Sequence, residues 1–257
     1  MKIKEVIAAL ERFAPLPLQE DFDNAGLQLG LTEAEVSGAL LCLDVTEDIV
    51  REAKEKGCNL IVSHHPLLFH GLKQIVDADM VQRCVRMAIT WDITIVSMHT
   101  NLDNAVGGVN WKIAEKLGLN SLMKDARQGE KYGMYVGELP QPMDAKTFIS
   151  HVKEKMEATV AMTNGLLDCP VSRVAICGGA GSFMLSEAIA AGADAFITGE
   201  MHYHEYFGHD GEIQICVIGH YESEHFTREV LEEIISRECP GVRCVMAENQ
   251  INPIKIM

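Results

Sequence analysis

Two adjacent histidines, His64 and His65, are the residues whose type and spacing point most directly to chemistry. They follow a short β-branched run, residues 59–63, that predicts a strand, and Pro66 ends any further ladder pairing. Open α/β sheets bind their ligands beyond the carboxyl ends of the strands. Imidazole is the commonest metal ligand and the usual acid or base near neutral pH. The pair therefore indicates a metal or catalytic site, and a surface turn that holds two polar rings is the alternative.

Two more predicted strands also end in histidine and carboxylate. Residues 93–99 end at His99, with Asp103 four residues later, and residues 213–218 lead to His220 and Glu224. The last two side chains share one face if a helix begins at His220. Buried charges need partners, so converging histidines and carboxylates favour a metal over simple packing. Mixed imidazole and carboxylate ligation suits zinc, manganese, iron or nickel.

The elements that position these residues follow a β-α-β pattern. We predict helices over residues 3–13, 46–57, 79–90 and 109–117, and strands over residues 37–44, 59–63 and 93–99. The strands are almost continuously apolar, which is typical of a parallel sheet covered on both faces. The fold class is therefore α/β.

A polar stretch over residues 125–131 predicts a lobe boundary. The first lobe would span residues 1–125 and be rejoined by residues 215–257, and the second would span residues 126–214. In the second half we expect strands over residues 132–139, 171–177, 194–200 and 213–218, and helices over residues 144–156, 185–190 and 223–237. The prolines at 140 and 142 are expected to break the first of these strands.

Two loops leave alternatives open. The Gly-rich turn from Gly178 to Ser182 could cradle phosphate on its amides, or it could be a tight strand-to-helix connection. Asp23 and Asn24 could contact a ligand, but such residues more often make turn hydrogen bonds.

Composition limits the class of protein. The 257 residues are 47% apolar and carry a net charge of −15 without a Lys/Arg run, which disfavours nucleic acid as a partner. The amino terminus lacks the apolar core of a signal peptide, and no stretch is long enough to span a membrane, so we expect a cytoplasmic protein. Eight cysteines without Cys-x-x-Cys spacing are expected to be reduced and mostly buried.

Several segments together resemble the signature blocks of one family, the NGG-one-interacting-factor-three-like (YbgI-like) proteins, whose members bear the name GTP cyclohydrolase 1 type 2 homolog. The blocks are Ser63-His64-His65-Pro66, His99-Thr100-Asn101-Leu102-Asp103, Gly178-Gly179-Ala180-Gly181-Ser182, Thr198-Gly199-Glu200 with His204, and Gly219-His220-Tyr221 with Ser223-Glu224. The resemblance covers nearly the whole chain. It implies two α/β lobes with mostly parallel mixed sheets, and a dinuclear metal site at strand carboxyl ends in the cleft.

The resemblance also implies roles for individual residues. The metal ligands would be His64, His65, Asp103, His220 and Glu224, with Glu224 bridging two divalent ions and the adjacent histidines bound to different ions. His99 and His204 would be the catalytic residues that move protons, and Glu200 would line the same cavity as His204.

The leading hypothesis is a metal-dependent hydrolase, resembling GTP cyclohydrolase, in which metal-activated water attacks a nucleotide-like or cyclic amide-like small molecule. The alternative is a non-catalytic divalent-metal-binding protein that acts in assembly, regulation or metal delivery. The resemblance further implies a homo-hexameric ring.

Overall fold

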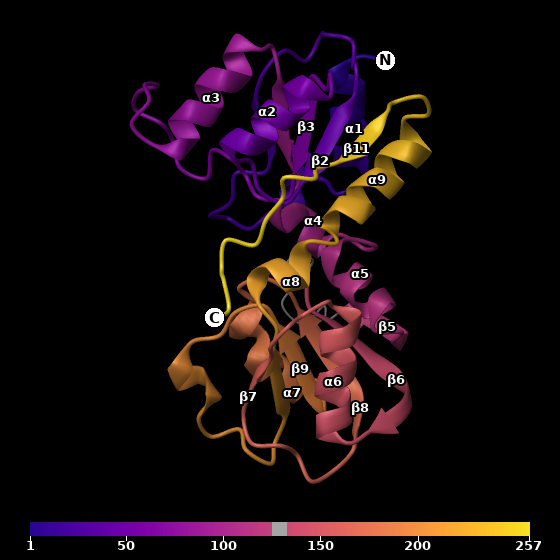
Figure 1. Cartoon of the computed structure of the whole chain (residues 1–257). Coiled ribbons are helices and arrows are strands. Elements are labelled where there is room, and N and C mark those ends of the chain that lie inside the picture. Colours follow the sequence, from indigo (N-terminus) through magenta and orange to yellow (C-terminus); the bar gives the residue numbers. More distant parts are fainter. Residues whose placement is uncertain (125–132) are drawn as a thin grey trace. The chain divides into compact units, whose positions relative to one another are not determined.

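The computed structural model describes residues 1–124 and 133–257, which form two compact units. Unit 1 comprises Met1–Ala105 and Thr227–Met257, and unit 2 comprises Val106–Phe226 (Figure 1). Both are mixed α/β structures, as the sequence predicts. Among the described residues, none of the helices is both long enough and apolar enough to span a membrane.

Unit 1 is built on one mixed sheet with the strand order β1-β4-β3-β2-β11. Only the edge strand β1 runs antiparallel to its neighbour. Its elements are α1 (Ile3–Phe13), the 3-10 turn η1 (Leu16–Leu18), β1 (Gly26–Leu29), β2 (Ala39–Cys42), α2 (Glu47–Glu55), β3 (Leu60–Ser63), α3 (Met80–Thr90), β4 (Thr94–Ser97), α4 (Thr100–Asn104), α9 (Thr227–Glu238) and β11 (Cys244–Met246).

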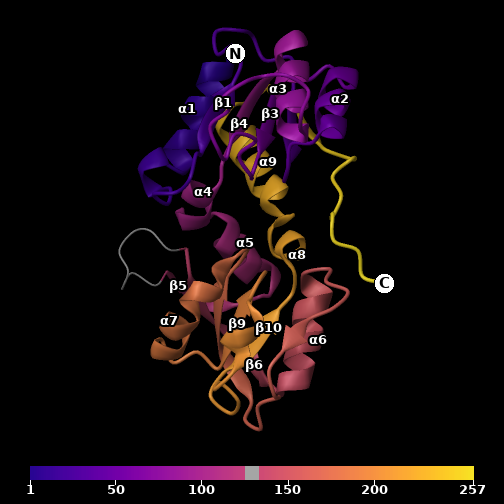
Figure 2. The ribbon, with the colours of Figure 1, turned by 90° about the vertical axis from the view of Figure 1, so that its left-hand side faces the viewer.

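Helices cover both faces of this sheet, which explains why its central strands β2, β3 and β4 are almost continuously apolar. α2 and α3 lie on one face, where Leu40 and Ile61 pack against Ile49 and Val85 (Figure 2). α1 and α9 pack against each other on the opposite face. Each of β2, β3 and β4 is buried along its whole length, so their carboxyl ends form a rigid edge.

Unit 2 contains a second mixed sheet, with the strand order β5-β6-β8-β9-β10-β7. β8, β9 and β10 are parallel, and the remaining pairs are antiparallel. Its elements are α5 (Val109–Lys116), β5 (Asn120–Lys124), β6 (Tyr135–Met143), α6 (Ala145–Lys155), β7 (Met162–Thr163), β8 (Val171–Cys177), η2 (Gly181–Met184), α7 (Leu185–Ala190), β9 (Ala195–Thr198), η3 (Tyr203–Tyr206), β10 (Gln214–Val217) and α8 (His220–Glu224). α7 covers one face and α6 the other (Figure 2).

The division of the chain differs from the predicted boundaries at residues 125/126 and 214/215. The polar stretch over residues 125–131 lies outside the described residues. α5 and β5 belong to unit 2, because β5 pairs with β6 and α5 packs on β6 and β8. β10 and α8 also stay in unit 2, since β10 pairs with β9 and β7.

Two local predictions are wrong. The prolines at 140 and 142 do not end β6, which continues to Met143 with an irregular register after Glu138. An irregular register tolerates proline because the missing N–H is not needed by a neighbouring strand. The helix predicted over residues 223–237 is two helices, α8 and α9, and the break between them is where the chain returns to unit 1.

The cysteines are free thiols, and most are buried, as predicted. Burial raises the pKa of Cys84 and of Cys216 to about 12. These thiols therefore stay protonated at neutral pH and serve as apolar packing groups.

Candidate metal centre

His64 and His65 directly extend β3 at its carboxyl end. The His64 amide donates to the Cys42 carbonyl over 3.2 Å, and the His65 amide donates to the Leu43 carbonyl over 2.9 Å. These bonds prolong the ladder to β2, so both histidine backbones are held by the sheet. The surface-turn alternative does not fit, because the His64 side chain is completely buried.

The His64 ring has a fixed orientation. Its Nδ1 lies 2.8 Å from the carbonyl oxygen of Met98, the residue just beyond β4. A carbonyl oxygen can only accept a hydrogen bond, so Nδ1 carries the proton and Nε2 presents the lone pair. The Nε2 atom lies 3.7 Å from Asp103 Oδ1. Neutral imidazole held in this way is the form that binds metals.

The His65 ring is oriented by a carboxylate. Its Nδ1 lies 2.7 Å from Asp44 Oδ1, and Asp44 follows β2 at the same edge of the sheet. Carboxylate partners of this kind fix the tautomer of a metal-binding histidine and increase its basicity. With Nδ1 facing Asp44, Nε2 is the nitrogen that could bind a metal ion.

His99 has an equivalent carboxylate partner, Asp23, whose Oδ1 lies 2.7 Å from His99 Nδ1. The other Asp23 oxygen accepts hydrogen bonds from the amide and the hydroxyl of Thr100. Burial alone would raise the pKa of Asp23. The hydrogen bond and charge of His99, the hydroxyl of Thr100 and the amide of Asn24 outweigh burial and lower the pKa from 3.8 to about 2. Asp23 is therefore ionised at neutral pH.

These three histidines converge. His64, His65 and His99 each offer a ligand nitrogen, and the three nitrogens lie within 4.8 Å of one another. Asp103 comes from α4, whose short turn begins just after His99. Unit 1 thus brings together three imidazoles and one carboxylate, a donor set suited to zinc and other divalent transition metals.

Unit 2 contains the other predicted ligands. α8 begins at His220, so His220 and Glu224 share one face, with 3.0 Å between His220 Nε2 and Glu224 Oε2. His220 Nδ1 lies 2.9 Å from Glu200 Oε1, at the end of β9. The Glu224 side chain is almost fully buried. A buried carboxylate next to an imidazole is a pair that could bind a metal ion.

The Gly-rich turn seats Glu224. The amide of Gly178 donates to Asn110 Oδ1 over 2.8 Å, and the amide of Gly179 donates to Ser223 Oγ over 3.0 Å. Gly179 has φ +57°, and a Cβ there would overlap Glu224 Oε1. Because these two amides are used within the protein, the geometry favours the tight connection over the phosphate cradle.

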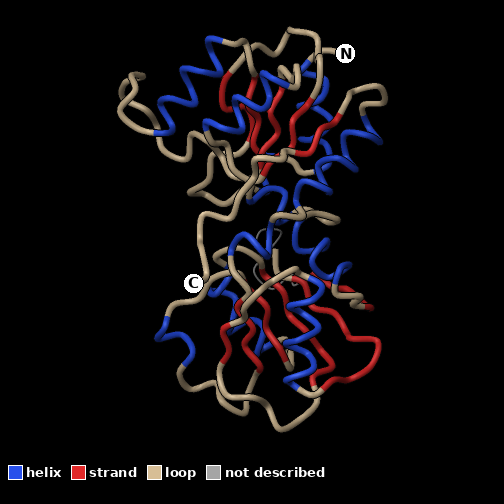
Figure 3. Tube along the Cα trace, viewed as in Figure 1, coloured by secondary structure: helices blue, strands red, loops and turns tan. Residues whose placement is uncertain are grey.

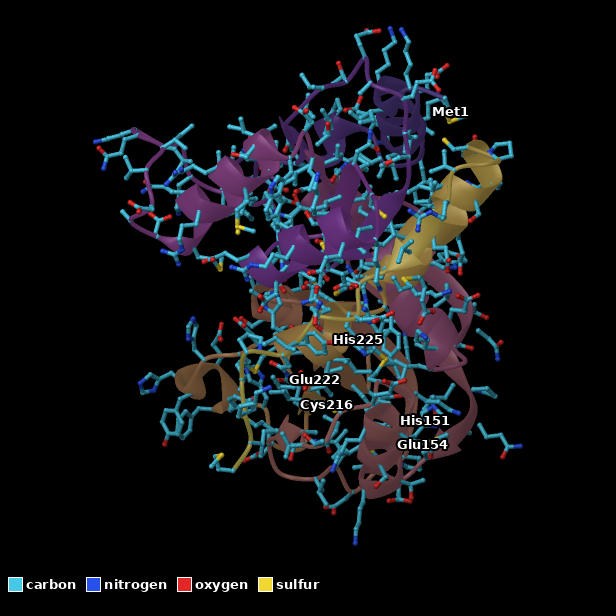
Figure 4. All side chains as sticks on the ribbon, turned by 45° about the horizontal axis from the view of Figure 1, so that its top comes forward. Met1, His151, Glu154, Cys216, Glu222 and His225 are labelled. Carbon is cyan, nitrogen blue, oxygen red and sulfur yellow. The ribbon has the colours of Figure 1, made fainter. Side chains whose placement is uncertain are left out.

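His204 and His225 have different surroundings. His204 lies on η3 at the surface, where its ring contacts those of Tyr203 and Phe207. Its proton-transfer role stays a prediction. His225, labelled in Figure 4, is buried and stacks on Tyr221 with ring centroids 5.2 Å apart. This stacking makes His225 a packing residue.

Asp44 and Asp23 are the residues of the candidate site to which the sequence assigned no role. A signal for Asp44 was available, since a carboxylate directly after β2 must lie at the same sheet edge as His65. Asp23 was considered but gave only a turn pattern. Its contact with His99 joins residues 76 positions apart, which a single sequence does not reveal.

Comparison with known proteins identifies relatives of the whole chain. A model of the Duf34/NIF3 (NGG1p interacting factor 3) family matches residues 1–253. Proteins named GTP cyclohydrolase 1 type 2 homolog from Clostridium acetobutylicum and Clostridium perfringens are each 33% identical, with 99% and 100% of this chain and 98% and 100% of theirs covered. The crystal structure of Staphylococcus aureus hypothetical protein SA1388 superimposes with a TM-score of 0.91 at 26% identity, covering 100% of this chain and 99% of that one.

Proposed function

The chain belongs to the Duf34/NIF3 (NGG1p interacting factor 3) family, and we propose that it is a hydrolase that depends on two divalent metal ions. The observation that supports this most strongly is the set of three histidines with oriented rings in unit 1. The name of the relatives, GTP cyclohydrolase 1 type 2 homolog, suggests a nucleotide-like or cyclic amide-like substrate.

The proposed ligands come from both units. His64, His65 and Asp103 from unit 1 would act together with His220 and Glu224 from unit 2 to hold one pair of ions. The ring nitrogens support this assignment, since Nδ1 of His65 is bound to Asp44 and Nδ1 of His220 is bound to Glu200. Zinc, manganese, iron and nickel all accept such a donor set.

Two divalent ions in such a site supply Lewis-acid stabilisation of developing charge and lower the pKa of water. The protein itself would supply the proton transfer. Asp23 holds His99 by Nδ1, so His99 Nε2 is the atom that would accept a proton from the nucleophile and return it to the leaving group. The ionised Asp23 stabilises the imidazolium formed on the way. His204 is the second candidate for this step.

The catalytic claim is tested with metal-free protein to which manganese, zinc, iron or nickel is added. GTP and a panel of phosphoesters and cyclic amides would be the substrates. We expect turnover that requires metal, is lost in His65→Ala and is retained in His209→Ala, whose half-buried ring pairs with Glu212. If the protein binds two ions and His65→Ala abolishes binding, but no substrate reacts with any metal, the non-catalytic metal-binding alternative replaces the hydrolase.

The shared ion pair needs a separate test. Metal content and affinity would be measured for His65→Ala, for Glu224→Gln and for the double variant. We expect both single variants to lower the same affinity, with non-additive effects, because residues that bind the same ions are coupled. If the effects of the two substitutions are fully additive, or if Glu224→Gln leaves the ion content unchanged, the two clusters do not bind the same ions.

We further propose the homo-hexameric ring that the family resemblance implies. Light scattering coupled to size-exclusion chromatography would give six times the mass of one chain. A monomer at micromolar concentration would remove this part of the proposal.

A further inference from the structure

The side chain of Gln250, in the segment that follows β11, contacts Asp44, the carboxylate partner of the candidate metal ligand His65. Ala247 still pairs with β2, its amide donating to the Leu41 carbonyl over 3.0 Å. Beyond this point the chain is a loop (Figure 3). Its path along unit 1 is therefore set by side-chain contacts rather than by a strand ladder.

Glu52 on α2 anchors the beginning of this segment. Its carboxylate accepts the amides of Glu248 and Asn249 over 2.8 and 2.9 Å, and it pairs with Lys56 Nζ at 2.8 Å. Only 2% of Glu52 is exposed. The next residue, Gln250, is consequently held beside the end of β2.

Gln250 then binds the residues that follow β2. Its Oε1 accepts the amides of Leu43 and Asp44 over 2.8 and 3.1 Å, and its Nε2 lies 3.5 Å from Asp44 Oδ2. β11 ends at Met246 and therefore offers no carbonyl oxygen to the amides of Leu43 and Asp44, and the Gln250 side chain supplies the acceptor instead. The other Asp44 oxygen binds His65 Nδ1.

We propose that Gln250 is a positioning residue for the metal centre, acting through Asp44 on His65. Gln250 Oε1 fixes the backbone by accepting the amides of Leu43 and Asp44. Gln250 Nε2 contacts Asp44 Oδ2, which leaves Oδ1 of the same carboxylate facing His65. Loss of Gln250 would let Asp44 rotate, and His65 would then lose its preference for the tautomer with the proton on Nδ1. This inference rests on the proposed metal site, in which His65 is a ligand.

The test uses the full chain with three substitutions. Gln250→Met keeps the length of the side chain but removes both kinds of hydrogen bond. Gln250→Glu keeps an acceptor for the two amides but places a carboxylate against that of Asp44. Asn249→Ala is the matched control, because it changes the neighbouring side chain and leaves the backbone bond to Glu52 in place.

Two readouts separate positioning from general stability. In metal-free protein, long-range ¹H–¹⁵N spectra report the tautomer of His65, and Gln250→Met should convert a single Nδ1–H tautomer into a mixture. In competition with a chelator, Gln250→Met should bind zinc about ten-fold more weakly, the lower end of the range for partners of metal ligands. Gln250→Glu should also shift the tautomer although it keeps the amide contacts.

Unchanged zinc affinity and an unchanged His65 tautomer in both Gln250 variants, relative to Asn249→Ala, would overturn the inference and leave the hydrolase proposal intact. Weaker zinc binding in the Gln250 variants of a protein that turns over no substrate would support the inference and remove the hydrolase. A wild-type chain that binds no zinc would remove both.

Discussion

A substitution at Gly179 tests whether the Gly-rich turn exists to seat Glu224. Gly179 has φ +57°, and an alanine Cβ there would overlap Glu224 Oε1, lie 3.2 Å from Glu224 Cδ and lie 3.6 Å from His220 Cε1. In Gly179→Ala the carboxylate must move away. Its 3.0 Å contact with His220 Nε2 would be lost with it.

The matched control is Gly192→Ala. Gly192 belongs to the same unit and has φ +70°, but a Cβ there meets no atom within 4 Å. Alanine in the left-handed region costs roughly 1–2 kcal/mol at either position. The difference between the two variants therefore isolates the displacement of Glu224 from the backbone strain.

In urea titrations of the metal-free protein, we expect Gly192→Ala to lower the free energy of unfolding by the backbone strain alone. Gly179→Ala should lower it further, because the Glu224 carboxylate is displaced as well. Zinc affinity, measured by chelator competition, should fall at least ten-fold in Gly179→Ala alone, or about 1.4 kcal/mol. Equal zinc affinities in the two alanine variants would refute the assignment of Glu224 as a ligand seated by Gly179.

Four further outcomes are expected. Asp44→Asn should weaken zinc binding by about 10–100-fold, measured by chelator competition, because it removes the carboxylate partner of His65. Asp144→Ala should cost about 1 kcal/mol in urea unfolding, since Asp144 caps α6 through the Thr147 amide. Phe196→Ala should cost about 3–5 kcal/mol in the same assay, because the ring is fully buried in unit 2. Glu52→Gln should flatten the acid side of the stability curve in urea midpoints measured against pH. Burial raises the pKa of Glu52, but the Glu248 and Asn249 amides and Lys56 outweigh it and hold the pKa below 4.5. The ionised Glu52 therefore stabilises the fold above pH 4.5, and this contribution is lost as the pH falls through the lowered pKa.

Local patterns in the sequence predict much of unit 1. α2 and α3 lie within the ranges predicted for them, residues 46–57 and 79–90, and Thr46 and Asp79 cap them. Continuous apolar runs give β2, β3 and β4, and a parallel arrangement then fixes which ends carry His65 and His99. These features need only neighbouring residues and the rule that parallel strands share one carboxyl edge.

The features that sequence reasoning missed depend on partners far away in the chain. β5 is mostly polar and exposed, and it forms a strand because it pairs with β6 across the predicted boundary. β11 is three residues long and pairs with β2, which lies about two hundred positions earlier. The Asp23–His99 contact has the same character, since each residue looks ordinary in its local sequence and only the folded chain brings the two together.

The division of unit 1 between the two ends of the chain affects its biosynthesis. At 5–20 residues per second, a ribosome that has made Ala105 needs on the order of 10 s before Thr227 emerges. During that interval one edge of β2 has no strand beside it, and an open edge invites pairing with other chains. Under the positioning role proposed for Gln250, His65 would acquire its final orientation only after Gln250, 250 − 65 = 185 positions later, has been synthesised. The orientation of His65 in the candidate metal centre would thereby wait for a segment that is made much later than His65 itself.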